Sequence, residues 1–185
     1  MKKISLILLA VFLVSGLNAQ VFNTGNTLSK GKFSATGAPV FGDGETMLIG
    51  KIGYGIKYGT DMAVTMGFGD VSYLGVDFEK VLGLEDLDNL VMSFSGGVHH
   101  SGGFGLDGTL NLTVPLDRSL HLYSGIDLDL ILTDGSGVPI YLFIGAEYTM
   151  KRKLTLIGEV DLGINDAGNM LGIGLCYYFN GIQIK

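Results

Sequence analysis

Apolar and polar side chains alternate along most of this chain with a period of two residues. In the stretch SGIDLDLILTD, Ile126, Leu128 and Leu130 fall on one side of an extended backbone, and Asp127 and Asp129 fall on the other. Successive side chains of a β-strand point to opposite faces, whereas a helix would mix the two sets. The pattern therefore predicts strands that each have one apolar face and one face of polar or small residues.

The same alternation divides the chain into about ten strand segments, which are separated by turn sequences such as GDG, TDGSG and NDAGN. The predicted strands are 31–41, 46–58, 61–69, 72–80, 89–99, 104–116, 119–132, 138–150, 153–164 and 168–179. Evenly spaced short strands joined by tight turns are typical of an antiparallel all-β fold. Eight strands remain an alternative if segment 31–41, which contains Pro39 and alternates weakly, is not a strand and a neighbouring pair is miscounted.

One-sided strands fit either a soluble sandwich with apolar faces inside or a membrane barrel with apolar faces toward lipid. The polar faces are rich in small residues and poor in lysine, which suits the crowded inside of a barrel. The strands are long enough, at roughly 9 to 13 residues, to cross a hydrocarbon layer when tilted. Apolar-face aromatic residues gather near strand ends, as in interfacial girdles, with Phe33, Tyr58, Phe78, Tyr148 and Phe179 toward one rim and Phe68 and Phe104 toward the other.

These observations predict a closed antiparallel up-and-down transmembrane β-barrel. Closure is required because an open sheet edge in hydrocarbon would leave backbone N–H and C=O groups unpaired. Glycine, at 30 of 185 residues, is spread through the strands and suits a sheet that curves or crowds side chains on one face.

The first twenty residues, MKKISLILLAVFLVSGLNAQ, have the form of a cleaved signal peptide. Two lysines precede an apolar run from Ile4 to Val14, and Ala19 precedes Gln20. The run is shorter than the ~17 to 25 apolar residues of a spanning helix. We therefore predict export, with a signal peptide at 1–19, an N-terminal lead segment at 20–30, the barrel at 31–179 and a C-terminal tail at 180–185.

Charge and cysteine content narrow the function classes. The net charge is −6, and removal of Lys2 and Lys3 with the signal peptide leaves ten basic and 18 acidic residues, a net charge of −8. Such a chain has no basic footprint for nucleic acid. Cys176 is the only cysteine, so no internal disulfide can form, and we expect a small inert side chain rather than a reactive thiol.

The chain resembles the small outer-membrane β-barrel proteins of Gram-negative bacteria, the class of the OmpA-like and OmpX-like barrels. The resemblance covers nearly all of 31–179 and depends on the signal peptide, the alternation, the aromatic girdles and the final strand MLGIGLCYYF. It implies an outer-membrane location, with outer-membrane lipid and the assembly machinery of that membrane as partners. The six residues NGIQIK after Phe179 and the short outer loops depart from the pattern of the class.

The inward positions of the predicted barrel collect many acids and few bases. The acidic cluster consists of Asp77, Asp107, Asp127, Asp129, Glu147, Glu159 and Asp161, with Asp61 and Glu79 in the same phase; the basic residues are Lys51 and Lys57, with His99 and His121. One hypothesis is a cation-attracting interior. The other is a hydrated polar plug in which the acids pair with lysines and tyrosine hydroxyls. A wide pore is not expected, because side chains fill barrels of only slightly smaller strand number.

A catalytic site is the third hypothesis. Ten-stranded outer-membrane proteases use aspartates and a His–Asp pair at the outer rim, and His99 with Asp107, Asp129 and Asp161 matches them in residue type alone. His99 and His100 in a glycine-rich turn are more typical of a polar turn than of a metal site. No cofactor or metal motif is present, so a non-catalytic barrel is favoured, serving envelope structure or a narrow passage for small solutes or cations. A soluble periplasmic barrel that binds an apolar ligand is the alternative.

Overall fold

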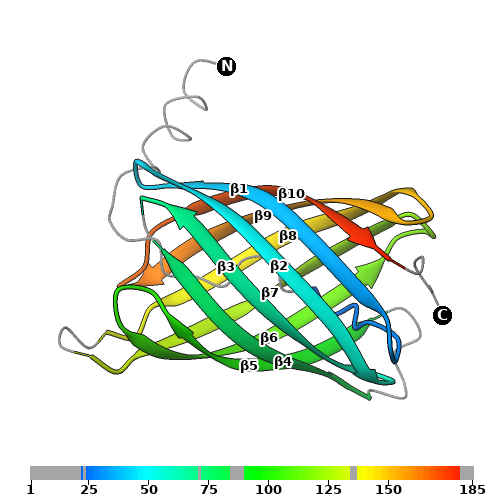
Figure 1. The fold of residues 1–185 in the computed structure, drawn as a ribbon, viewed down its shortest axis with the longest axis horizontal. Helices are drawn as coiled ribbons and strands as arrows, with labels where there is room; N and C mark the ends of the chain where they lie inside the picture. The colour runs from blue at the N-terminus through cyan, green and yellow to red at the C-terminus, as the bar shows by residue number, and fades with distance from the viewer. Residues whose placement is uncertain (1–21, 23, 71, 84–89, 134–136, 180–185) are drawn as a thin grey trace.

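The computed structural model describes residues 22, 24–70, 72–83, 90–133 and 137–179, so the predicted signal peptide and C-terminal tail lie outside the described residues. The strands are β1 (Phe33–Gly42), β2 (Glu45–Lys57), β3 (Thr60–Gly69), β4 (Tyr73–Leu82), β5 (Val91–His100), β6 (Phe104–Pro115), β7 (Leu120–Ile131), β8 (Ile140–Lys151), β9 (Leu154–Asn165) and β10 (Met170–Tyr178). Each strand pairs antiparallel with its sequence neighbours, and β1 pairs with β10, so the sheet closes into a barrel (Figure 1). The predicted closed barrel of ten strands is confirmed.

The first strand is a full member of the barrel, which excludes the eight-stranded alternative. It pairs with β2 along its whole length and with β10 on either side of Pro39, at Gly37↔Leu175 and Val40↔Gly172. Proline has no N–H to donate to a ladder, so the β1–β10 seam accepts it only as a local interruption.

Tight turns connect the strands and define two ends of the barrel. Asp43 and Gly44 both have positive φ, 47° and 84°, as a two-residue type I′ hairpin turn requires. We call the end where β1 begins and β10 ends the terminal rim; the β2–β3, β6–β7 and β8–β9 turns lie there too. The other end, with the β1–β2, β3–β4, β5–β6, β7–β8 and β9–β10 connections, is the opposite rim.

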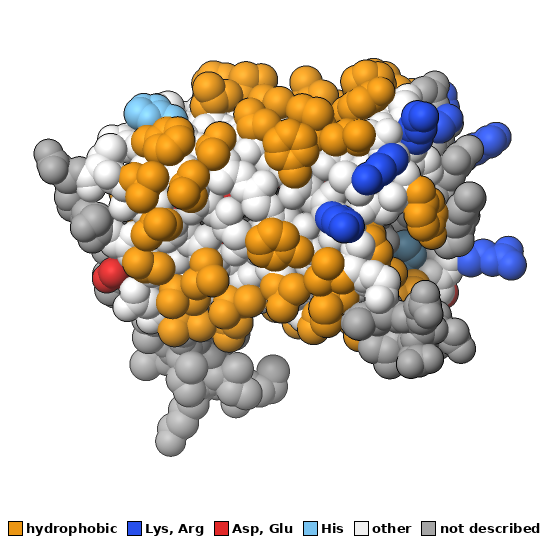
Figure 2. All heavy atoms as spheres, turned by 90° about the horizontal axis from the view of Figure 1, so that it is seen from below, with side chains coloured by type: hydrophobic (Ala, Val, Ile, Leu, Met, Phe, Trp, Pro, Cys, Tyr) orange, Lys and Arg blue, Asp and Glu red, His pale blue; other side chains and the backbone are white. Residues whose placement is uncertain are grey.

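Apolar side chains cover the outside of the barrel. Leu128 and Leu130 of β7 are 45% and 43% exposed, whereas Asp127 and Asp129 on the other face of the same strand are each 2% exposed. Figure 2 shows apolar side chains over the length of the barrel wall, with lysine and arginine gathered near one end. The sheet thus has its apolar face outward, as the small residues of the polar faces, the aromatic positions and the strand lengths predicted.

Large inward side chains alternate with glycines on neighbouring strands. A Cβ atom on Gly145 of β8 would overlap the ring of Tyr123 of β7, and one on Gly125 would overlap the ring of Phe143. Tyr123, Phe143 and Tyr141 are all buried. The high glycine content therefore makes room for aromatic rings inside a narrow barrel.

Candidate functional site

The barrel interior is the candidate site, because its strands direct acidic side chains inward. Asp77, Asp127, Asp129, Glu147, Glu159 and Asp161 are buried, and the side chain of Asp107 is 4% exposed. Their strands, β4 and β6 to β9, place them at alternate positions on one face of the sheet. Asp61 of β3 and Glu79 of β4 share this inward phase, which makes nine enclosed acids among the described residues.

Basic side chains are much rarer in the interior. Lys51 projects inward from β2, where its ammonium group donates to the carbonyl oxygen of Phe22 at 3.4 Å. Lys57 instead lies exposed at the end of β2, because a register shift between Gly55 and Lys57 ends the regular alternation there. The prediction that Lys57 belongs to the interior is therefore corrected, and Lys51 is the only lysine that the described strands direct inward.

His99 lies between two of these acids near the opposite rim. Its Nδ1 is 3.4 Å from an Asp107 oxygen, and its Nε2 is 3.4 Å from an Asp129 oxygen. The ring stacks on Tyr73, with the centroids 5.5 Å apart and 17° between the planes. Asp161 lies farther round the barrel on β9, opposite Phe143, so the structure brings together His99, Asp107 and Asp129.

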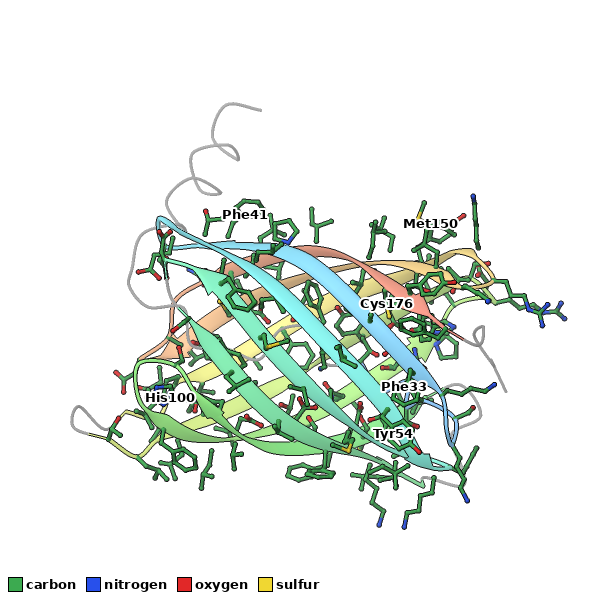
Figure 3. The ribbon with its side chains drawn as sticks, viewed as in Figure 1. Phe33, Phe41, Tyr54, His100, Met150 and Cys176 are labelled. Atoms are coloured by element: carbon green, nitrogen blue, oxygen red, sulfur yellow. The ribbon has the colours of Figure 1, made fainter. Side chains whose placement is uncertain are left out.

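His100 differs from its neighbour in exposure. It follows His99 in β5 and is exposed at the opposite rim, where Figure 3 labels it. The two histidines thus point to different faces of one strand and form no joint site.

Hydroxyl groups supply part of the hydrogen bonding that the buried acids need. Thr109 donates to Asp127 at 2.5 Å, and Ser93 donates to Glu79 at 2.5 Å. Buried carboxylates are costly unless they are hydrogen-bonded or paired. Neutral hydroxyl groups therefore provide part of the stabilisation that lysine or arginine side chains would otherwise provide to these carboxylates.

Residues of the lead segment form a second source of donors, because they lie inside the barrel. The backbone N–H groups of Phe22, Gly25 and Leu28 donate to Glu159 at 2.6 Å, to Thr113 at 3.0 Å and to Asp61 at 2.7 Å, respectively. These three acceptors come from β9, β6 and β3, on different sides of the barrel. The lead segment therefore crosses the interior rather than following one wall.

The side chain of Asn26 also links this segment to the barrel wall. Its amide nitrogen donates to Glu147 at 2.5 Å and lies 2.9 Å from Nδ1 of His121. Closer to the terminal rim, the segment presses on β2: a Cβ atom on Gly55 would overlap the carbonyl group of Ser29. The backbone N–H of Gly31 donates to the carbonyl oxygen of Gly55 at 2.8 Å, and the N–H of Gly55 donates to the carbonyl oxygen of Lys32 at 2.9 Å.

A cavity of about 70 Å³ remains beside this segment. That volume is large enough for water molecules. Its lining includes Phe22, Asn26, Lys51, Asp61, Asp77 and Glu147. The interior of the barrel is thus narrow and acidic, and is partly filled by the chain itself.

The lead segment was not predicted to enter the barrel. The sequence from Phe22 to Lys30 has no period of two, and three of its bonds use backbone N–H groups, which every non-proline residue has. One sequence feature that could have indicated it is the excess of inward acids over inward bases. Buried carboxylates need hydrogen-bond donors, and a segment that enters the barrel can provide them.

Two further searches of the structure bear on function. No helix among the described residues is long and apolar enough to span a membrane. Across the same part of the chain, no group of three or more histidine, cysteine, aspartate or glutamate residues is placed to hold a metal ion. Cys176 is buried on the inward face of β10 (Figure 3).

Comparisons with known proteins give structural matches without sequence matches. No family model and no curated protein matches the chain. Among solved structures, KdgM porin is 11% identical, with 79% of this chain and 99% of that chain covered and a TM-score of 0.57. NanC porin is also 11% identical, with 78% and 98% covered and a TM-score of 0.57. At this identity the likeness shows the fold, which is that of outer-membrane β-barrels.

Proposed function

We propose that this chain is an integral outer-membrane β-barrel without catalytic activity, and that its acidic interior is a narrow passage for water and small cations. The observation that carries the proposal is the excess of acids inside the closed barrel. Nine carboxyl groups face the interior, where Lys51 is the single inward lysine of the described strands. Charges of one sign in a low-dielectric channel concentrate counter-ions.

The outer surface supports the membrane location. Apolar side chains such as Leu128, Leu142 and Ile173 are about half exposed on strands that are paired on both edges. In water, a continuous apolar surface of this extent would favour aggregation, whereas hydrocarbon accommodates it. The soluble alternative needs apolar faces turned inward, which is the reverse of the observed orientation.

The interior favours small cations over large anions. A second structure of KdgM porin, 10% identical with 79% and 99% covered and a TM-score of 0.52, is described as a complex with disordered oligogalacturonate, which is a polyanion. The acidic interior of this chain would repel a polyanion. The ligand of that porin therefore does not carry over to this chain with the shared fold, and we propose a selectivity for small cations instead.

The surroundings of His99 weigh against a rim hydrolase. A general base needs one ring nitrogen directed at the proton that it removes. Both ring nitrogens of His99 face carboxylates, those of Asp107 and Asp129, and the residue is 6% exposed. A buried ring with a carboxylate beside each nitrogen supports our assignment of His99 to interior packing and charge balance.

Conductance in planar bilayers tests the proposed passage. We expect the reconstituted barrel to conduct in small steps and to give a reversal potential that favours K⁺ over Cl⁻ in a salt gradient. Asp127→Asn should lower that preference, because Asp127 is buried in the interior. Asp117→Asn is the matched control, since it removes the same charge from an exposed turn. A folded, inserted barrel that never conducts would contradict the passage and leave a structural role in the envelope.

A further inference from the structure

Basic side chains outside the barrel gather at one end. Of the lysines and arginines that the structure describes, all except Lys51 lie at or beside the terminal rim. They are Lys30, Lys32, Lys57, Lys80, Arg118, Lys151, Arg152 and Lys153. All are exposed except Lys32, which is half-buried. Figure 2 shows this gathering near one end of the molecule. We call these eight residues the basic ring.

The opposite rim has the opposite charge among the described residues. Asp43 and Glu45 lie at the β1–β2 turn, Asp70 follows β3 and Asp166 follows β9. None of the described lysines or arginines lies there. The barrel is therefore charged unequally at its two ends, although its net charge is negative.

The basic ring directly borders the apolar wall. Lys80 pairs across strands with Phe94, which is 51% exposed on the same outward face. Phe33 is the first residue of β1 and directly follows Lys32 in the chain. Its ring packs on Tyr54, with the ring centroids 4.7 Å apart (Figure 3). Aromatic rings of membrane barrels mark the boundary between hydrocarbon and headgroups. Basic side chains just beyond that boundary lie at headgroup depth, with stems that can follow the apolar wall.

We infer that the basic ring binds the phosphate groups of anionic phospholipids in the leaflet at the terminal rim. Its members lie just before β1, near the ends of β2, β4 and β8, and in the β6–β7 and β8–β9 turns, so they are distributed around the barrel. A compact protein partner would contact one side, whereas a shell of lipid surrounds every side. Lysine and arginine favour phosphate oxygens through charge-assisted hydrogen bonds. This inference depends on the proposed membrane location and goes beyond the proposed passage.

Competition between lipids tests the inference. Purified mature protein in neutral detergent is mixed with dioleoylphosphatidylglycerol and dioleoylphosphatidylcholine, and the bound lipids are counted by native mass spectrometry. We expect the wild type to retain phosphatidylglycerol preferentially. The triple variant Lys151→Gln, Arg152→Gln, Lys153→Gln should weaken that retention at least about tenfold, since each basic residue near a surface contributes about fivefold. High salt should weaken it as well.

Two control variants separate the basic ring from general charge effects. Lys151→Arg with Lys153→Arg keeps the charge and should keep the preference. Asp43→Asn with Glu45→Gln and Asp166→Asn changes the net charge by three units at the opposite rim and should leave the preference unchanged. Equal retention of both lipids by the wild type, or a preference that follows net charge wherever it is altered, would overturn the inference. Heat-dependent gel mobility checks folding of each variant, so a failed barrel is distinguished from a failed lipid site.

Discussion

Adjacent residues of one strand occupy opposite environments in this protein. Leu128 is 45% exposed on the apolar outer wall, whereas Asp127 is 2% exposed inside. A slip of one residue in the register would exchange these environments for the whole strand. The register is therefore specified by the cost of placing carboxylates in lipid and leucines in the acidic interior.

Leu128→Arg tests the outward environment at the residue scale. We expect a loss in the free energy of unfolding that approaches the roughly 2 to 4 kcal/mol of a midplane arginine, because arginine is poorly accommodated in hydrocarbon. Leu116→Arg introduces the same side chain at the exposed β6–β7 turn and should cost about 0 to 1 kcal/mol, as expected near an interface. Reversible urea unfolding in lipid vesicles measures both. Equal costs at the two positions would contradict a lipid-facing Leu128.

Asp117 gives a pH-dependent prediction outside the membrane-spanning strands. The backbone N–H groups of Ser119 and Leu120 donate to its carboxylate at 2.6 and 2.9 Å and hold its pKa below the ordinary value of 3.8. A lowered pKa in the folded state stabilises the turn above the unfolded-state pKa, and the stabilisation disappears as pH falls through the folded-state pKa. The free energy of unfolding of Asp117→Asn should therefore be lower than that of the wild type at pH 7, and the two values should converge in strong acid. A constant difference across this range would contradict the assignment.

At the scale of elements, the lead segment and the strands have different physical origins. The strands form because a period of two separates an apolar face from a polar face. The lead segment is held by hydrogen bonds to groups on β3, β6, β8 and β9. It therefore depends on the finished barrel, which supplies acceptors on several sides at once.

Removal of the lead segment tests its role as a partial plug. A chain that begins at Gly31, refolded into detergent, is compared with one that begins at Gln20. We expect a larger single-channel conductance for the shorter chain, because residues 22–30 would no longer cross the interior. Asn26→Ala, which removes the contacts to Glu147 and His121, should give an intermediate increase. Identical conductances for all three would show that the segment does not limit passage.

The strands could be predicted from sequence more fully than the contents of the barrel. All ten predicted segments overlap observed strands, because one-sided burial repeats along each of them. Lys57 was misplaced because a local register shift, which has no clear sequence pattern, ends the alternation. The lead segment was missed because Phe22, Gly25 and Leu28 bind through backbone groups, which carry no sequence signal.

At the scale of the whole molecule, charge and apolar surface are separated into distinct regions. Acids fill the interior, apolar side chains cover the wall, and the basic ring lies at the terminal rim. We propose a different neighbour for each region: small cations inside, hydrocarbon around the wall and phosphate groups at the rim. The account depends most on the wall, since both the passage and the basic ring require a barrel that is inserted in a membrane.

Fractionation of cells tests insertion most directly. The full chain is expressed in a Gram-negative host, the outer membranes are washed with carbonate, and samples are run on SDS gels with and without boiling. The account predicts a carbonate-resistant outer-membrane protein whose mobility changes on heating, because a closed barrel resists SDS until it is boiled. Release of the folded protein with the soluble periplasm would contradict the account, since it would place the exposed leucines of the wall in water.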